Sequence, residues 1–313
     1  MRIAYIITAY QDPPQLRRLI ESLDEGADFF VHVDSRVDIR AFQTGLAARR
    51  NVRFTENRFF VNWGSFAQVL SQKELLRCVM ATGVAYDRVV CLSGADYPIW
   101  SNRAIADEFL KHPAREWIAG FNVTRCAEAD HHERVAQHHF LREIRLPNRT
   151  LKRWATGSAR LAVRGLCALT GFKRSEQVPL AGRMVDIYTG SDYWALTFDC
   201  ARFVYDRMCN EPGLMQYFKY SYVPSEMCVQ TIVFNSRFAP AAQLCEGSYR
   251  GLASLTPLHH LEYTDAIRVF EEDDFEGLLA SGKIFFRKAQ SGRSDGLLAK
   301  VDAYRRNDRV NIG

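Results

Sequence analysis

The sequence predicts an α/β protein with a Rossmann-like, mostly parallel sheet flanked by helices. Apolar, β-rich runs alternate with amphipathic helical runs from residue 2 to residue 99, and such alternation is typical of a doubly wound sheet. The composition agrees with a globular fold, because 47% of the 313 residues are hydrophobic and 25% are charged. This length fits one large domain or two closely packed halves.

The first half of the chain contains the alternating elements. "RIAYIITAY" is apolar and β-rich, as in a buried strand, and "QDPP" ends it. The next run has Leu16, Leu19 and Ile20 at helical spacing, with proline in its first turn. In order, the expected elements are a strand at 2–10, a helix at 13–25, strands at 28–35 and 51–56, a helix at 65–82 and a strand within 86–99.

Ligands of doubly wound sheets bind at the carboxyl ends of the strands. We expect that edge to carry Thr8, Asp34, Ser93, Gly94 and Asp96.

The second half returns to regular structure after residue 184. The expected elements are two strands joined by a Gly-Ser turn at 184–198, a helix at 199–210, a strand at 259–265 and a helix, turn and basic end at 275–290. The tail after "SGRSDG" is polar, and we expect a terminal helix with a frayed end.

A basic segment separates the two halves. The net charge of the chain is +5, and residues 134–174 hold ten Lys or Arg against one acid, Glu143. One interpretation is a solvated insertion packed by its Leu and Trp. The other is a surface that contacts a membrane or an acceptor. Nucleic acid is not expected as a partner, because no nucleic-acid-binding motif accompanies the charge.

The eight cysteines and the apolar runs bear on the compartment. No CxxC occurs, and most cysteines lie in apolar runs, so we expect reduced, partly buried thiols. No apolar run reaches the roughly 18 to 20 residues that span a bilayer, and the first ten residues do not resemble a signal peptide. We therefore expect a cytoplasmic protein, with peripheral membrane contact through 134–174 as a further option.

A lone carboxylate in "VPSEMCVQTIVFNS" (223–236) is the first candidate for chemistry. Ser225 is expected to cap a helix, which would place Glu226 in the first turn. The amide groups and dipole of a helix start favour an ionised carboxylate, and such a group suits a general base. Taken alone, Glu226 is better interpreted as a surface acid at a helix start.

Two other short stretches contain candidate ligand-binding side chains. In "TGSDYWALT", Asp192 precedes Tyr193 and Trp194, and aromatic rings beside a carboxylate are common where sugars bind. A turn aspartate that caps its own backbone is the alternative. In "FFRKA", Arg287 and Lys288 follow an apolar anchor and could neutralise phosphate oxygens. The alternative, which is the ordinary one for such a pair, is two solvated surface cations.

A bound metal is not expected. His32 and Asp34 alternate on a strand and should point to one face, but no further ligand cluster follows at a useful spacing. "HHERVAQHHF" lacks the HExxH form.

The order of these blocks is similar to that of a known family. The chain resembles the core-2/I-branching β-1,6-N-acetylglucosaminyltransferases, a family that also includes peptide O-xylosyltransferases. The matching blocks, from residue 4 to residue 289, are "AYIITAYQDPPQLRRLI", "FFVHVDS", "VNWGSF", "YDRVVCLSGADYPI", "GSDYWALT", "PSEMCVQTIVFNS", "LHHLEY" and "FFRKA". The resemblance implies a GT-A-like fold and an inverting transfer from a UDP-sugar to a hydroxyl, without an essential metal or other cofactor.

The resemblance also implies roles for individual residues. Glu226 would be the general base and Lys288 a ligand of the UDP diphosphate. The expected substrate-binding residues are Asp192, Tyr193, Trp194, Trp63 and Arg134. The expected donor-binding residues are Thr8, Asp34, Ser93, Gly94, Asp96, Arg250, His259, Arg287 and Lys288.

Some positions depart from the family pattern. His259 stands where the family often shows an arginine, so Arg250 or Arg287 would have to act as the second diphosphate-binding cation. Ser65 and Ala67 replace a more usual glycine and serine, and we do not expect the amino-terminal membrane anchor of the secreted members.

The predicted function is transfer of N-acetylglucosamine or xylose from a UDP-sugar to a glycan or glycoconjugate acceptor. A non-catalytic glycan- or nucleotide-binding protein on the same fold is the main alternative, and a peripheral membrane protein is a third. The expected organisation is one integrated catalytic domain in four parts: a nucleotide-sugar-binding half at 1–125, the basic insertion at 126–182, an acceptor and catalytic half at 183–290 and a C-terminal tail at 291–313.

Overall fold

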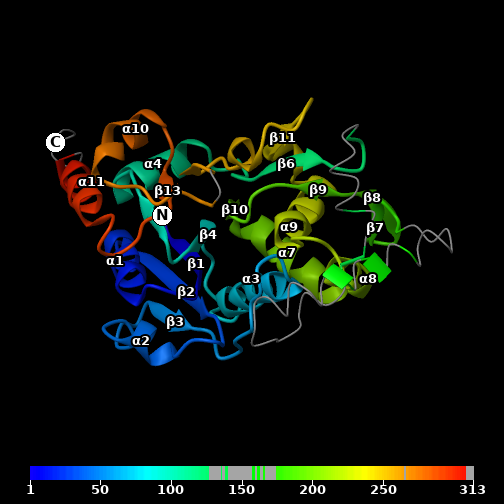
Figure 1. Cartoon of the computed structure of the whole chain (residues 1–313), viewed down its shortest axis with the longest axis horizontal. Coiled ribbons are helices and arrows are strands. Elements are labelled where there is room, and N and C mark those ends of the chain that lie inside the picture. Colours follow the sequence, from blue (N-terminus) through cyan, green and yellow to red (C-terminus); the bar gives the residue numbers. More distant parts are fainter. Residues whose placement is uncertain are drawn as a thin grey trace.

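The centre of the protein is a five-stranded sheet in the order β10-β4-β1-β2-β3 (Figure 1). The structure is a computed structural model that describes residues 1–126, 135, 138–139, 157–158, 161–162, 165, 174–263 and 266–307. The strands of the central sheet are β1 (Ile3–Ala9), β2 (Ala27–Val33), β3 (Val52–Phe54), β4 (Arg88–Ser93) and β10 (Ala195–Thr197). All neighbours are parallel except β10, which pairs antiparallel with β4.

Helices cover both faces of this sheet. The helices of the described residues are α1 (Pro13–Leu23), α2 (Ile39–Gln43), α3 (Phe66–Met80), α4 (Asn102–Lys111), α7 (Phe198–Asn210), α8 (Pro212–Lys219), α9 (Ser225–Phe234), α10 (Phe275–Ala280) and α11 (Asp295–Asn307). Ala4 and Ile6 of β1 belong to the core cluster that contains the apolar residues of α3 and α7. Tyr5 and Ile7 belong to the cluster beneath α1 and α4. This alternation follows from the two-residue period of a strand, and both faces are apolar because both are covered.

These observations confirm the predicted Rossmann-like, mostly parallel sheet flanked by helices, and they agree with a GT-A-like fold. The predicted elements of residues 2–93 all occur, with ends shifted by a few residues. The predicted strand–turn–strand unit at 184–198 is divided into β8 (Arg183–Asp186), β9 (Tyr188–Thr189) and β10.

Short strands build three smaller sheets. One has the order β12-β13-β5, with β5 (Asp96–Pro98), β12 (His259–Leu261) and β13 (Phe285–Arg287). A second has the order β11-β6-β9, with β6 (Ala119–Asn122) and β11 (Gln243–Cys245), and β7 (Gln177–Leu180) pairs with β8 as a hairpin. Single 3-10 turns lie at Ala239–Ala241, Leu252–Leu255 and Glu272–Asp274.

The sheet of β12, β13 and β5 joins distant parts of the sequence. Because β13 pairs with β5, Arg287 lies opposite Asp96, which follows the end of β4. The stretch "FFR" was expected as a basic end after a turn, and it is a strand instead.

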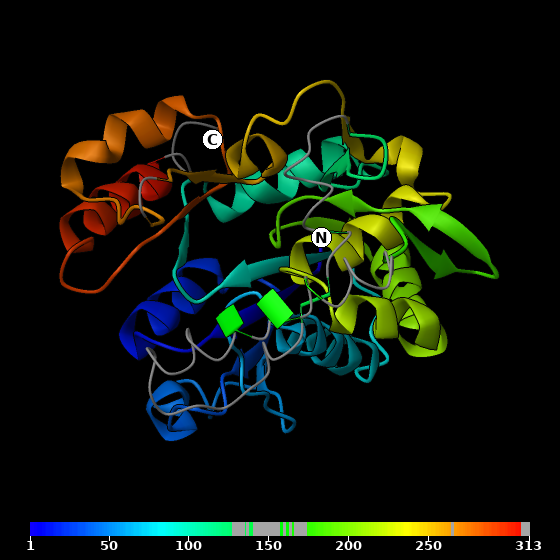
Figure 2. The ribbon, with the colours of Figure 1, turned by 45° about the vertical axis from the view of Figure 1, so that its right-hand side comes forward.

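The C-terminal helix α11 is part of this packing. Leu297, Leu298 and Val301 are fully buried in a cluster with Tyr97 and Phe286. Figure 2 shows the orange and red C-terminal segments on the same side of the molecule as the blue helix α1, and Arg18 of α1 pairs with Asp302 of α11 at 3.0 Å. The predicted terminal helix is therefore present, with one apolar face in the core. Among the described residues, no helix combines the length and apolarity needed to cross a bilayer.

Candidate active site

The carboxyl edge of the central sheet brings together the residues that were expected there. Thr8 on β1 lies between His32 on β2 and Ser93 on β4. Gly94 donates its N–H to the Thr8 carbonyl at 2.9 Å, and Asp34 donates its N–H to the Ala9 carbonyl at 2.9 Å. This is the edge at which doubly wound sheets bind ligands.

His32 and Asp34 both hold the loop that leads to Trp63. His32 Nε2 accepts the Phe59 N–H at 3.0 Å, and Asp34 Oδ2 accepts the Val61 N–H at 3.2 Å. The two strand residues face the same loop, as their two-residue spacing predicted. Burial lowers the pKa of His32 to about 4, so the neutral ring keeps the acceptor nitrogen that Phe59 needs.

The Asp34 carboxylate also engages Arg36. Arg36 Nε and Nη2 donate to its two oxygens at 3.0 and 2.7 Å, while Asp34 is 2% exposed. The half-exposed Arg36 is therefore the group of this pair that can reach solvent at the sheet edge.

A buried cluster around Asp96 lies next to this edge. Asp96 Oδ2 accepts the Ser93 N–H at 2.7 Å and contacts His259 Nε2 at 3.2 Å. Asp96 Oδ1 accepts the Ser93 hydroxyl at 3.1 Å and Arg287 Nη1 at 3.0 Å. Burial alone would raise the pKa of the Asp96 carboxyl, but His259 and Arg287 lower it below its usual value.

Tyr193 connects His259 and Arg287. Its ring centroid lies 4.9 Å from that of His259 and 5.0 Å from the Arg287 guanidinium carbon. Trp194, its neighbour, is fully buried in the main core cluster. The Trp194 ring therefore has no exposed face for a sugar, and we do not retain it as a substrate-binding residue.

Glu226 lies in the first turn of α9, as predicted, but the cap differs from the prediction. The helix begins at Ser225 after Pro224, and no side chain caps it. Ser225 Oγ instead donates to Asp192 Oδ2 at 3.3 Å. Val223 just before this helix has φ 44°, a strained value for a β-branched residue of the kind that clusters at functional sites.

The turn after β9 docks on this helix start. Gly190 donates its N–H to the Glu226 carbonyl at 2.8 Å. A Cβ on Gly190 would overlap the Ala119 carbonyl oxygen, so glycine permits this close approach. Gln230 of α9 donates to the Ser191 carbonyl at 2.6 Å. These bonds hold the turn that carries Asp192 against the start of α9, where Glu226 lies.

Asp192 is an unusual carboxylate for its surroundings. Burial raises its pKa to about 6, although Ser225 and Arg287 oppose that rise. Its Oδ1 atom is buried and has no hydrogen-bond partner within the described residues. A buried acceptor without a donor is costly in a protein interior, and active sites are where such groups concentrate.

Tyr263, which was not expected from the sequence, lies in the same region. Tyr263 is 55% exposed. Partial burial raises its pKa, and so do the nearby charges of Glu226 and Asp192, while Arg287 opposes them. Tyr263 therefore lies within electrostatic reach of both carboxylates and the cation. Its place in "LHHLEYT", two residues after β12, was the available signal.

Trp63 is connected to this region by a ring contact with Tyr222. The two rings meet edge to face with centroids 5.9 Å apart, and Trp63 is 66% exposed. Tyr222 also contributes to the electrostatic environment of Tyr263. An exposed indole here is suited to stacking on a sugar ring.

Lys288 lines a pocket of about 610 Å³ together with Arg268, Arg293 and residues of the 266–274 loop. Burial lowers its pKa, and the neighbouring cations Arg287 and Arg293 lower it further. Arg268 and Arg293 have carboxylate partners, whereas Lys288 makes no ion pair within the part of the chain that the structure describes. It is therefore a cation available to a ligand.

Of the remaining expected site residues, one makes no contact with this cluster in the described residues and the other is not described. Arg250 is exposed and follows Tyr249, whose ring contacts Phe121 on β6 at 5.8 Å. Arg134 and most of 134–174 lie outside the described residues.

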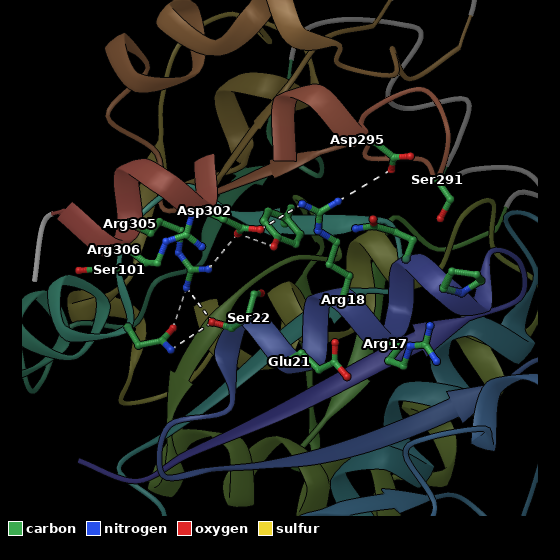
Figure 3. A pocket seen from close by; sticks show the side chains of 14 residues that line it. Arg17, Arg18, Glu21, Ser22, Ser101, Ser291, Asp295, Asp302, Arg305 and Arg306 are labelled. Carbon is green, nitrogen blue, oxygen red and sulfur yellow. Dashed lines mark hydrogen bonds and ion pairs between the residues drawn. The ribbon is translucent and has the colours of Figure 1, made fainter. Parts of the chain in front are cut away.

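Within the described ranges, no group of three His, Cys, Asp or Glu is arranged to hold a metal ion. A separate pocket of about 670 Å³ lies between α1, α4 and α11 (Figure 3). Its Arg18 is paired with Asp302, and Arg305 with the Trp100 and Ser22 carbonyls, so these groups hold helices together.

Comparison with known proteins identifies the family of the chain. A search among curated proteins found no match. The family model described as "Branch: Core-2/I-Branching enzyme" matches residues 3–243, more than half of the chain. That range includes the sheet edge, Asp192 and Glu226, and members of the family are glycosyltransferases with a sugar donor and an acceptor. The protein therefore belongs to the Core-2/I-Branching enzyme family of glycosyltransferases.

Proposed function

We propose that the protein is an inverting glycosyltransferase that moves N-acetylglucosamine or xylose from a UDP-sugar to an acceptor hydroxyl. The observation that carries the proposal is geometric: the turn with Asp192 docks on the first turn of α9, where Glu226 lies, and Arg287 lies over the ring of Tyr193 in the same turn. These contacts bring two carboxylates and a cation into one region of the fold.

Glu226 is the proposed general base. An acceptor hydroxyl is a poor nucleophile near neutral pH, and a carboxylate that takes its proton as the bond forms contributes about 10²- to 10⁴-fold in rate. The start of α9 favours the ionised form of this side chain. The bonds from Gly190 and Gln230 to the surrounding backbone fix its position.

Arg287 and Lys288 are the proposed ligands of the UDP diphosphate. Negative charge grows on the diphosphate as the sugar leaves, and fixed cations stabilise it. Arg287 is ion-paired with Asp96, and the positive charge of Arg287 contributes to the lowered pKa of the neighbouring Lys288. Arg287 is favoured over Arg250 as the second cation because Arg250 is outside this cluster.

Asp192 and Trp63 are the proposed sugar-binding groups. Asp192 Oδ1 is a buried acceptor without a protein donor, and a sugar hydroxyl would supply one. Trp63 offers an exposed ring at the rim. With a base on one side of the sugar and cations on the other, displacement would proceed in line and invert the anomeric centre, as in inverting glycosidases.

A panel of UDP-sugars tests this proposal. The purified protein is incubated with UDP-N-acetylglucosamine, UDP-xylose, UDP-glucose and UDP-galactose, and released UDP is measured with and without candidate acceptor glycans. We expect release from one of the first two donors, increased by an acceptor. Saturable UDP binding without release from any donor would contradict the proposal and identify a nucleotide-binding protein.

A further inference from the structure

We propose that Asp96 is a positioning residue that aligns Arg287 for an oxyanion of the donor and does not itself touch the donor. This inference rests on the proposed function, because it assumes that Arg287 meets the diphosphate. It replaces the expectation that Asp96 lines the donor pocket.

The first argument is that Asp96 has no surface to offer. Its side chain is 0% exposed. A carboxylate has about four acceptor sites, and four contacts within the protein occupy them. They come from the Ser93 N–H, the Ser93 hydroxyl, His259 Nε2 and Arg287 Nη1. A ligand would have to displace one of these groups.

The second argument concerns the orientation of Arg287. Its hydrogen bonds within the described residues all involve Nη1, which contacts Ser93 Oγ and Asp96 Oδ1. Arg287 Nε is buried and has no partner within the described residues. Because Arg287 is anchored through Nη1, the edge formed by Nε and Nη2 remains for a ligand. A guanidinium edge of this kind binds an oxyanion with two parallel hydrogen bonds.

The third argument explains His259. It is 1% exposed, and its ring stacks on Phe285 with centroids 5.2 Å apart and contacts Tyr193 on another side. A side chain so enclosed supports Asp96 and cannot reach a diphosphate. The histidine at a position where the resemblance led us to expect an arginine thus belongs to the support of Arg287.

Both oxygens of Asp96 are needed for this role. Oδ2 meets the Ser93 N–H and Oδ1 meets the Arg287 guanidinium, and neither of these groups can accept a hydrogen bond. In Asp96→Asn the amide nitrogen must face one of them. Because the backbone N–H of Ser93 is fixed in the sheet, we expect Arg287 to be displaced.

A double-mutant cycle on UDP affinity tests the inference. UDP binding is measured by calorimetry for the unmodified protein, Asp96→Asn, Arg287→Ala and the double variant. We expect each single variant to bind UDP about 10- to 100-fold more weakly, as for loss of a charge-assisted bond. The double variant should bind no more weakly than Arg287→Ala. Losses that multiply would overturn the inference, because Asp96 would then act without Arg287.

A matched control excludes a general effect of losing a carboxylate near β5. Asp302 accepts the Tyr97 hydroxyl at 2.7 Å and pairs with Arg18 at 3.0 Å in the separate pocket (Figure 3). Asp302→Asn should leave UDP affinity within twofold. An equal loss of affinity in this control would assign the Asp96→Asn effect to the fold, and overturn the inference.

A milder variant keeps the inference testable if Asp96→Asn does not fold. Ser93→Ala removes one hydroxyl that contacts both Asp96 and Arg287. It should weaken UDP binding severalfold in the unmodified protein and not at all beside Arg287→Ala. No loss of UDP affinity in the unmodified protein, or a loss that persists beside Arg287→Ala, would overturn this inference but not the proposed function. An unmodified protein that binds no UDP would overturn both.

Discussion

The change that Asp192→Asn makes in the free energy of unfolding should be more favourable at pH 8 than at pH 4. Asp192 Oδ1 is buried without a hydrogen-bond partner in the described residues, and burial raises the pKa of the carboxyl from 3.8 to about 6. The folded protein therefore holds this group in an environment that opposes its ionisation. Asparagine has nearly the same shape and carries no charge.

The magnitude follows from the pKa. A shift of about two units corresponds to about 3 kcal/mol between the two protonation states. Between pH 4 and pH 6 the folded protein retains a proton that the unfolded chain has released, so the free energy of unfolding falls as the pH rises through this window. Below the window the carboxyl is neutral in both states, and above it the full cost is present.

The assay is urea unfolding of both proteins at pH 4, 6 and 8. The variant's free energy of unfolding minus that of the unmodified protein should increase by up to about 3 kcal/mol from pH 4 to pH 8. Packing of the amide cancels in this comparison because it is the same at each pH. A difference that stays constant, or that falls as the pH rises, would refute the reasoning.

Two further predictions concern the leaving group. Lys288→Ala should weaken UDP binding about 10- to 100-fold, because it removes the ammonium that lines the pocket beside Arg268 and Arg293 and that is proposed to bind phosphate. Arg250→Ala, which removes an exposed cation from outside the cluster, is the matched control and should bind UDP normally; equal affinities in both variants would refute the assignment of Lys288. Sugar transfer should persist in excess EDTA, because Arg287 and Lys288 supply the positive charge, and complete loss that Mg²⁺ or Mn²⁺ restores would contradict this.

The sequence was most informative where local pattern and tertiary structure agree. The alternation of β1, α1 and β2 follows from apolar runs and from the proline near the start of α1. The carboxyl-edge position of Thr8 and Ser93 follows from that order alone, since parallel strands end at one edge. Glu226 was placed in the first turn of α9 correctly.

Other features depend on contacts that no short pattern contains. Strand β13 has three residues and pairs with β5, which is remote in sequence, so nothing local indicated that Arg287 faces Asp96. Ser225 was expected to cap α9, but the backbone turns at Val223, with φ 44°, and frees the hydroxyl for Asp192. The Trp194 carbonyl accepts the N–H of Cys91 on β4, and its side chain packs into the main core cluster.

Tyr263 shows a similar limit. It follows β12 by two residues, and its neighbours Glu226 and Asp192 lie on other elements. Only the assembled fold brings them together, so the residue was not distinguished from other surface tyrosines.

The central claim is that Glu226 accepts the proton of the acceptor hydroxyl. The measurement is UDP-sugar transfer and UDP affinity for Glu226→Gln, beside Glu211→Gln as a control for loss of another glutamate at a helix start. We expect Glu226→Gln to lose about 10²- to 10⁴-fold in transfer rate while its UDP affinity stays within twofold, and Glu211→Gln to retain both. Transfer by Glu226→Gln at the unmodified rate would contradict the claim.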